Sequence, residues 1–177
     1  MEDIFLHRRG SSDGNFPRRI LVTCAAALLL SMLYYTIFHF SAQDAEQSGS
    51  LSLKVSYKGA EIVNCIWGGR WGDSLEELAL FLEHPVRKMA HFSEYACMGA
   101  LLFLLWSQWI RQGWVLRILV TVWGLLSAAA DEFHQYFVPG RYASVADVLL
   151  DTCGGVCGMG FCLCVLALWK RRKKGRL

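Results

Sequence analysis

Four long apolar runs separated by polar segments dominate the pattern of the chain. They cover about residues 20–40, 86–110, 114–137 and 145–169. Each is at least as long as the roughly 20 residues that an α-helix needs to cross about 30 Å of hydrocarbon. The pattern predicts an all-α membrane protein with a four-helix domain over residues 20–169, an N-terminal segment over residues 1–19 and a basic tail over residues 170–177.

The polar connection over residues 41–85 is too long for a structureless loop in a compact domain. Residues 42–57 are rich in Ser and Gln, and we interpret them as a juxtamembrane helix. Asp73 and Glu76 resemble a capping box ahead of leucines at helical spacing. This second pattern predicts a short amphipathic helix that lies on the membrane surface and ends near Pro85.

Composition supports the membrane class. Hydrophobic residues make up 54% of the chain and charged residues only 19%, whereas charged residues are about a quarter of an ordinary soluble domain. Six of the seven cysteines lie inside the apolar runs, where a thiol acts as a small hydrophobe. The cysteines therefore predict no disulfide framework.

The basic residues predict the orientation. With the N-terminus in the cytoplasm, the inner side holds twelve of the eighteen Lys and Arg residues but three of the fifteen acids. The positive-inside rule therefore places both termini in the cytoplasm and the long loop outside. An anionic leaflet explains the basic tail, so no nucleic-acid partner is needed.

Polar side chains gather near the outer ends of three predicted helices. Steps of three and four residues put them on shared faces, and ionisable groups at such a depth belong in a bundle interior. The spacing predicts one outward-opening pocket. The candidates are Lys88, His91, Glu94 and Tyr95 in the second helix, Asp131, Glu132, His134 and Gln135 in the third, Arg141 in the following turn, and Asp147 and Asp151 in the fourth helix.

Simpler roles compete with a shared pocket. Arg87, Lys88 and Arg141 are long enough to reach lipid head groups, and Asp147 or Ser144 is suited to cap the fourth helix. A polar network could also serve only to hold the helix ends together. Small residues that allow close helix packing are found at Gly99, Gly154 and Gly158.

Two stretches of this region carry a recognisable motif. They are Lys88-x-x-His91-Phe92-x-Glu94-Tyr95-x-x-x-Gly99 and Asp131-Glu132-x-His134-Gln135-x-x-Val138-Pro139-Gly140-Arg141-x-x-Ser144-x-x-Asp147-Val148, followed by Gly154 and Gly158. The motif resembles that of the VanZ-like membrane proteins, a family named after a teicoplanin-resistance protein. The resemblance covers about residues 38–158 and implies a cell-envelope protein of a Gram-positive bacterium. Asp151 stands where the family usually has Asn, which adds a carboxylate near Asp147.

The first functional hypothesis is an outer-leaflet pocket that binds an anionic ligand. Lys88 and Arg141 would hold a phosphate or carboxylate, for which Arg offers a bidentate grip. The ligand would be a membrane lipid, a lipid-linked cell-wall precursor or a lipoglycopeptide, and the resemblance connects this hypothesis with glycopeptide resistance. The remaining ligand-binding candidates are Tyr95, Glu132, Gln135, Asp147 and Asp151.

Two other function classes stay open on the sequence alone. An intramembrane enzyme would use His91 or His134 as a general base, oriented by Glu94 or Asp131. A transporter or flippase would need a homodimer to supply a second half, since no internal repeat is evident. A divalent metal is less favoured because there is no compact motif such as His-Glu-x-x-His. Its ligands would be His91, Glu94, His134 and Asp147.

Overall fold

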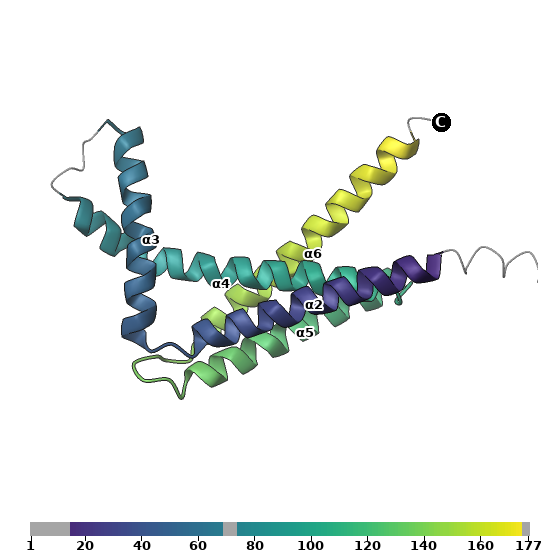
Figure 1. The fold of residues 1–177 in the computed structure, drawn as a ribbon, viewed down its shortest axis with the longest axis horizontal. Helices are drawn as coiled ribbons and strands as arrows, with labels where there is room; N and C mark the ends of the chain where they lie inside the picture. The colour runs from purple at the N-terminus through teal and green to yellow at the C-terminus, as the bar shows by residue number, and fades with distance from the viewer. Residues whose placement is uncertain (1–14, 69–73, 175–177) are drawn as a thin grey trace, which may run out of the picture.

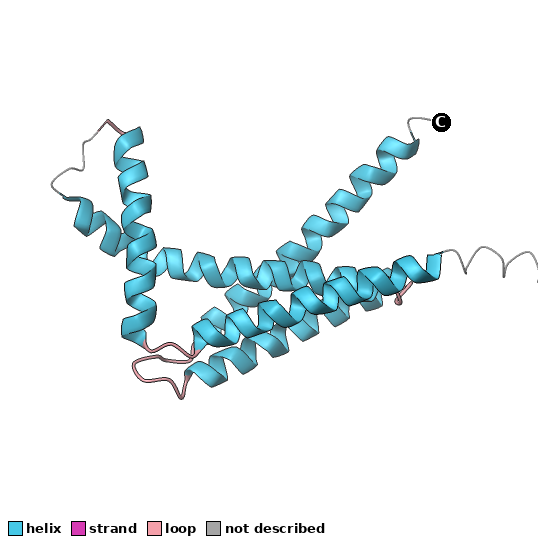
Figure 2. Cartoon of the chain, viewed as in Figure 1, coloured by secondary structure: helices cyan, strands magenta, loops and turns pink. Residues whose placement is uncertain are grey.

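The computed structural model describes residues 15–68 and 74–174, and these residues form five helices and no strand (Figures 1 and 2). Four of the helices are long and apolar enough to cross a membrane, which confirms the prediction of four spans in a multi-pass membrane protein. The helices are α2 (Phe16–Ser41), α3 (Ala45–Ile66), α4 (Leu75–Ser107), α5 (Gly113–Gln135) and α6 (Val145–Lys174), and the spans are α2, α4, α5 and α6.

Local chemistry sets several of the helix ends. Pro17 stands in the first turn of α2, where its missing N–H costs nothing. The Asp44 carboxylate accepts a 2.7 Å hydrogen bond from the backbone N–H of Gln47 and so caps α3. Between α5 and α6, Gly140 adopts a φ of 75° in the turn after Pro139, a conformation that favours glycine.

The prediction of a separate helix ending near Pro85 is wrong. α4 begins at Leu75, continues through Pro85 and ends only at Ser107. Proline removes one backbone hydrogen bond and bends a helix, and α4 changes direction where it passes behind α3 (Figure 1). Continuing the helix keeps the other backbone groups paired, which an apolar environment favours.

The helix that lies crosswise to the bundle is α3, which extends the predicted 42–57 helix to Ile66 (Figure 1). Its buried residues Ser52, Ser56 and Ala60 are small and are spaced by four, so one narrow face packs against α4. The Ser52 hydroxyl donates a 2.5 Å hydrogen bond to Glu83 of α4. α3 therefore lies over the end of the bundle that carries the polar residues.

Glycines bring α4 and α6 into backbone contact. Close packing at Gly99, Gly154 and Gly158 was predicted, but the sequence did not specify which helices meet there. A Cβ atom on Gly158 would lie 1.8 Å from the carbonyl oxygen of Ala96, and one on Gly99 would lie 1.9 Å from that of Gly155. No side chain fits at such a distance. The seam between α4 and α6 thus depends on glycine at these positions.

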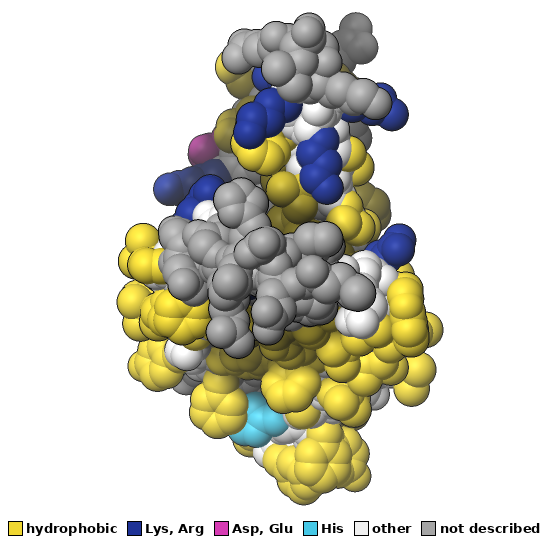
Figure 3. All heavy atoms as spheres, turned by 90° about the vertical axis from the view of Figure 1, so that its right-hand side faces the viewer, with side chains coloured by type: hydrophobic (Ala, Val, Ile, Leu, Met, Phe, Trp, Pro, Cys, Tyr) yellow, Lys and Arg dark blue, Asp and Glu magenta, His cyan; other side chains and the backbone are white. Residues whose placement is uncertain are grey.

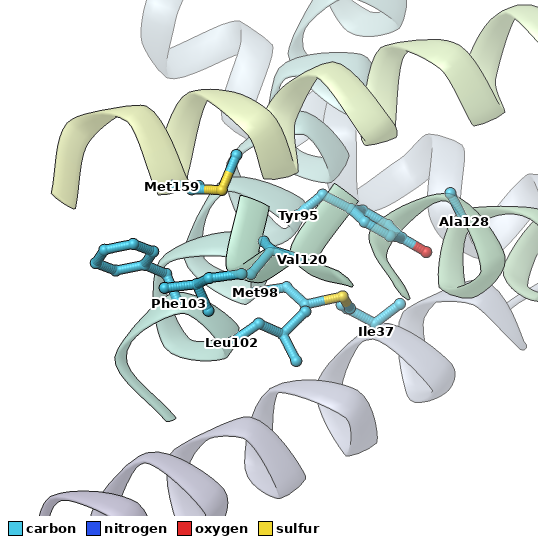
Figure 4. Close-up of a cluster of buried hydrophobic side chains, with 9 residues drawn as sticks. Ile37, Tyr95, Met98, Leu102, Phe103, Val120, Ala128 and Met159 are labelled. Atoms are coloured by element: carbon cyan, nitrogen blue, oxygen red, sulfur yellow. The ribbon is translucent and has the colours of Figure 1, made fainter. Parts of the chain in front are cut away.

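The apolar core occupies the middle of the bundle (Figure 4). Tyr95 closes the core at the end nearest the polar residues, and its ring reaches toward Ala128 of α5 (Figure 4). His91 lies one helical turn before Tyr95 in α4, toward the N-terminal end of that helix. The polar site therefore begins directly where the core ends. The core side chains are Ile37, Tyr95, Met98, Leu102, Phe103, Leu116, Val120, Ala128 and Met159.

Basic residues mark the opposite end of the bundle. The start of α2, with Arg18 and Arg19, and the end of α6, with Lys170 to Lys173, lie at this end (Figure 1). Viewed from there, Lys and Arg side chains gather in the upper part of the surface (Figure 3). This arrangement matches the charge pattern used above, and the cytoplasmic location of this end stays a prediction.

Candidate functional site

A polar cavity of about 240 Å³ lies where α4, α5, α6 and the α5–α6 turn meet. It gathers seven of the eleven candidate residues, from three helices and the turn. Convergence of separate helices on one site was the main expectation from helical spacing. The lining residues are His84, Arg87, Lys88, His91, Glu132, Gln135, Gly140, Arg141, Tyr142, Asp147, Leu150 and Asp151.

The structure does not bring all eleven candidates into this cavity, because the other four line neighbouring cavities. Tyr95, Asp131 and His134 line an apolar cavity of about 450 Å³ between α2 and α5. Glu94 lines a cavity of about 150 Å³ between α3 and α4. The helical faces of these residues point to different neighbours, which spacing alone does not specify. The apolar cavity is completed by Tyr34, Ile37, Phe38, Trp123, Leu126, Ser127 and Ala130.

Side-chain contacts fix the residues of the apolar cavity. The His134 ring stacks on Phe38, with ring centroids 4.7 Å apart. The Tyr95 hydroxyl donates a 3.3 Å hydrogen bond to the Ser127 carbonyl. Tyr95 is thus a core residue that borders the apolar cavity, and not a lining residue of the polar one.

One lysine and one arginine of the polar cavity are paired with carboxylates. Lys88 of α4 forms an ion pair with Asp147 of α6, and Arg87 forms one with Glu83. The hydroxyl of Ser144 accepts a 3.4 Å hydrogen bond from the backbone N–H of Asp147. Ser144 is therefore the cap of α6, and Asp147 instead ties α6 to α4.

Arg141 is held in place by α5 and the end of α2. Its Nη1 donates to Gln135 Oε1 at 3.0 Å and its Nη2 donates to the Phe40 carbonyl at 3.4 Å. Burial lowers the pKa of the Arg141 guanidinium, and the charge of Arg87 acts in the same direction. Arginine side chains keep their proton in proteins, so Arg141 still carries a positive charge.

Gln135 connects the two larger cavities. Besides accepting from Arg141, it donates a 3.0 Å hydrogen bond to Asp131 Oδ2. Nearby, Glu132 Oε2 accepts a 2.8 Å hydrogen bond from the backbone N–H of Ser144. Glu132 thereby holds the α5–α6 turn against α5 and fixes this part of the cavity wall.

A histidine and two aspartates meet between these cavities. His91, Asp131 and Asp151 each offer one ligand atom, and these atoms lie within 4.8 Å of one another. Only His91 of the metal ligands suggested by the sequence, which were His91, Glu94, His134 and Asp147, belongs to this cluster. Glu94 and His134 line other cavities, and Asp147 pairs with Lys88.

Buried polar atoms without a hydrogen-bond partner are concentrated at this site. Within residues 15–68 and 74–174, every such side-chain atom belongs to a residue that lines one of the two larger cavities. Buried polar groups are normally paired, so a group of unpaired ones calls for an explanation such as a missing ligand or ion. The atoms are Arg87 Nε, His91 Nδ1, His134 Nε2, Arg141 Nε and Asp151 Oδ1.

Comparison with protein families identifies the family of this chain. The model of the VanZ/LLP1 family matches residues 26–168, most of the 177-residue chain. The chain belongs to the VanZ/LLP1 family. The VanZ/LLP1 match includes every residue of the polar and apolar cavities. No curated protein and no solved structure matches the chain.

Some lining residues of this VanZ/LLP1 chain are not among the sequence candidates. Arg87 could have been found, since Glu83, Arg87 and His91 follow one another in steps of four on α4. Tyr34 and Trp123 gave no signal. Their contact, a 2.8 Å hydrogen bond from Trp123 Nε1 to the Tyr34 hydroxyl, depends on which helices pair.

Proposed function

We propose that this VanZ/LLP1 membrane protein binds an amphiphilic ligand with an anionic head group and an acyl chain. The observation that carries the proposal is the adjacency of two cavities with opposite chemistry. Asp131 lines the apolar cavity, and through Gln135 it connects with Arg141 of the polar cavity. One ligand could therefore occupy both.

The polar cavity is suited to a phosphate or carboxylate group. It contains Arg87, Lys88 and Arg141, and the Nε atoms of both arginines are buried without a partner. An N–H of a guanidinium group forms a short, charge-assisted hydrogen bond with such an anion. Arg141 is the stronger candidate, because its described partners are a neutral amide and a backbone carbonyl.

The apolar cavity is suited to the acyl chain. Its volume of about 450 Å³ falls in the range of about 300–1,000 Å³ that ligand sites usually have. Aromatic and aliphatic side chains line most of it. The cavity lies between the spans α2 and α5, so an acyl chain could enter it from the surrounding lipid.

Two kinds of natural ligand meet these requirements. A lipoglycopeptide combines an anionic group with an acyl chain, and a lipid-linked cell-wall precursor carries a long polyprenyl chain in the place of the acyl chain. If the termini are cytoplasmic, as the charge pattern predicts, both cavities face the outer leaflet, where either ligand would be present. The second ligand would link this site to glycopeptide resistance of the teicoplanin type.

The test compares two lipids that differ only in the anionic group. We expect the purified full chain to bind a short-chain phosphatidic acid about tenfold or more tightly than the matching diacylglycerol. Arg141→Gln should remove this preference and leave diacylglycerol binding unchanged. Teicoplanin, added as a competitor, shows whether a lipoglycopeptide uses the same site.

Arg117→Gln is the matched control, because Arg117 is an exposed arginine near the start of α5. It should retain the preference for phosphatidic acid. Equal affinity of the wild type for both lipids, or an equal loss in both arginine variants, would contradict a head-group site at Arg141.

A further inference from the structure

The cluster of His91, Asp131 and Asp151 brings together one side chain from each of α4, α5 and α6. Asp131 is 9% exposed and Asp151 is 2% exposed, so both carboxylates are withdrawn from bulk solvent. Burying two acids together is costly unless a positive charge accompanies them. The nearby basic side chains must therefore be considered first.

The described contacts direct these basic groups elsewhere. Lys88 pairs with Asp147, and Arg87 pairs with Glu83. Arg141 donates to Gln135 and to a backbone carbonyl. Within the part of the chain that the structure describes, no lysine or arginine forms an ion pair with either aspartate of the cluster.

An independent observation points to a ligand at this position. Asp151 is almost completely buried, and its Oδ1 has no hydrogen-bond partner. His91 Nδ1 forms no hydrogen bond either, and its neighbour is Glu94 Oε2 at 3.5 Å. The unpartnered oxygen thus belongs to a nearly fully buried residue of the cluster.

We propose that His91, Asp131 and Asp151 bind a divalent transition-metal ion such as Zn²⁺ or Mn²⁺. One imidazole and two carboxylates are a donor set that such ions accept. Metal–ligand bonds of about 2.1 Å hold any two ligand atoms within about 4.2 Å of each other. The observed limit of 4.8 Å therefore requires only small side-chain rotations.

The surroundings of the cluster support this donor set. Gln135 donates to Asp131 Oδ2 at 3.0 Å, which orients that carboxylate as outer partners of metal ligands do. Asp151 contributes a second buried carboxylate to the cluster, which makes the cluster more anionic. Water or the anionic group of a bound lipid would fill the remaining coordination positions.

The experiment measures metal binding without any lipid. The full chain, purified and treated with EDTA, is titrated with Mn²⁺ and followed by electron paramagnetic resonance, with Zn²⁺ as a competitor. We expect one Mn²⁺ per chain for the wild type and at least tenfold weaker binding for Asp151→Asn and for Asp131→Asn. Glu61→Gln, which neutralises an exposed acid on α3, should bind as the wild type does.

Thermal unfolding distinguishes a metal site from a structural pair. In EDTA, Asp151→Asn should be at least as stable as the wild type, because it removes a buried carboxyl group that no lysine or arginine pairs with. Added Mn²⁺ should raise the Tm of the wild type and not that of Asp151→Asn. If the variant is less stable than the wild type in EDTA, or binds Mn²⁺ equally well, the proposal is overturned.

This inference goes beyond lipid binding and does not depend on it. Failure to bind Mn²⁺ leaves the phosphatidic acid experiment standing, and the reverse also holds. Arg141→Gln, which should lose the lipid preference, should retain the metal, because Arg141 is not a ligand in the proposed cluster. The two results together separate a metal site from a head-group site.

Discussion

Two helix seams of this protein are built in opposite ways. Between α4 and α6, glycines allow the backbones to touch, and a Cβ on Gly158 would nearly overlap the carbonyl oxygen of Ala96. Between α2 and α5, large side chains such as Tyr34 and Trp123 hold the helices apart and leave the cavity of about 450 Å³. One seam is closed, and the other contains space.

The two seams contribute different residues to the cluster of His91, Asp131 and Asp151. The closed seam joins the helices that carry His91 and Asp151, so their relative position is set by backbone contact. Asp131 comes from the open seam and lines its cavity. In the proposed metal site, two of the ligands would thus come from closely packed helices, and the third borders the apolar cavity.

The largest expected effect comes from breaking the closed seam. Gly158→Ala places a methyl group where the Ala96 carbonyl lies, and backbone atoms cannot rotate away as a side chain can. We expect a loss of more than about 4 kcal/mol of stability, because overpacking here separates two helices. Thermal unfolding in detergent, together with membrane abundance, measures it.

Gly160→Ala is the control for that variant. Gly160 lies on the same helix, and a Cβ there would meet nothing within 4 Å. Alanine should be tolerated or should stabilise by up to about 1 kcal/mol, as expected from helix propensity. Similar Tm values for the two variants would show that the seam is not closed by glycine.

The sequence predicted the spans and the close packing at the glycines, because both leave local signals, but it did not predict which helices form the closed seam. Apolar runs of sufficient length mark α2, α4, α5 and α6, and glycines mark the contact of α4 with α6. The prediction that a helix ends near Pro85 was wrong, although proline usually ends or bends a helix. Within a membrane-type fold, α4 continues past it to Ser107.

The site was only partly predictable, because spacing fixes a face but not the neighbour that it meets. His91 and His134 looked equivalent as sequence candidates. The structure sends His91 toward Asp151 and His134 against Phe38. Choosing between them requires knowing which helices pair, and only the α4–α6 pair has a glycine signal.

The open seam can be tested by filling it. Ala130 is an exposed residue that lines the apolar cavity, so Ala130→Phe should occupy space meant for an acyl chain. We expect about a tenfold or greater loss of phosphatidic acid affinity, with Tm nearly unchanged. Ala129→Phe, at an exposed neighbour that does not line the cavity, should bind normally. Equal phosphatidic acid affinities of the two variants would mean that the acyl chain does not occupy this cavity.

The smallest effect should come from loosening the open seam without filling it. The Tyr34 hydroxyl shares a 2.7 Å hydrogen bond with Ser127 Oγ and accepts one of 2.8 Å from Trp123 Nε1. Tyr34→Phe removes both and should lower the stability by about 1–2 kcal/mol. Tyr35→Phe, at a side chain that is 72% exposed, should change the Tm little. Equal shifts would mean that the two α5 contacts of Tyr34 contribute no measurable stability.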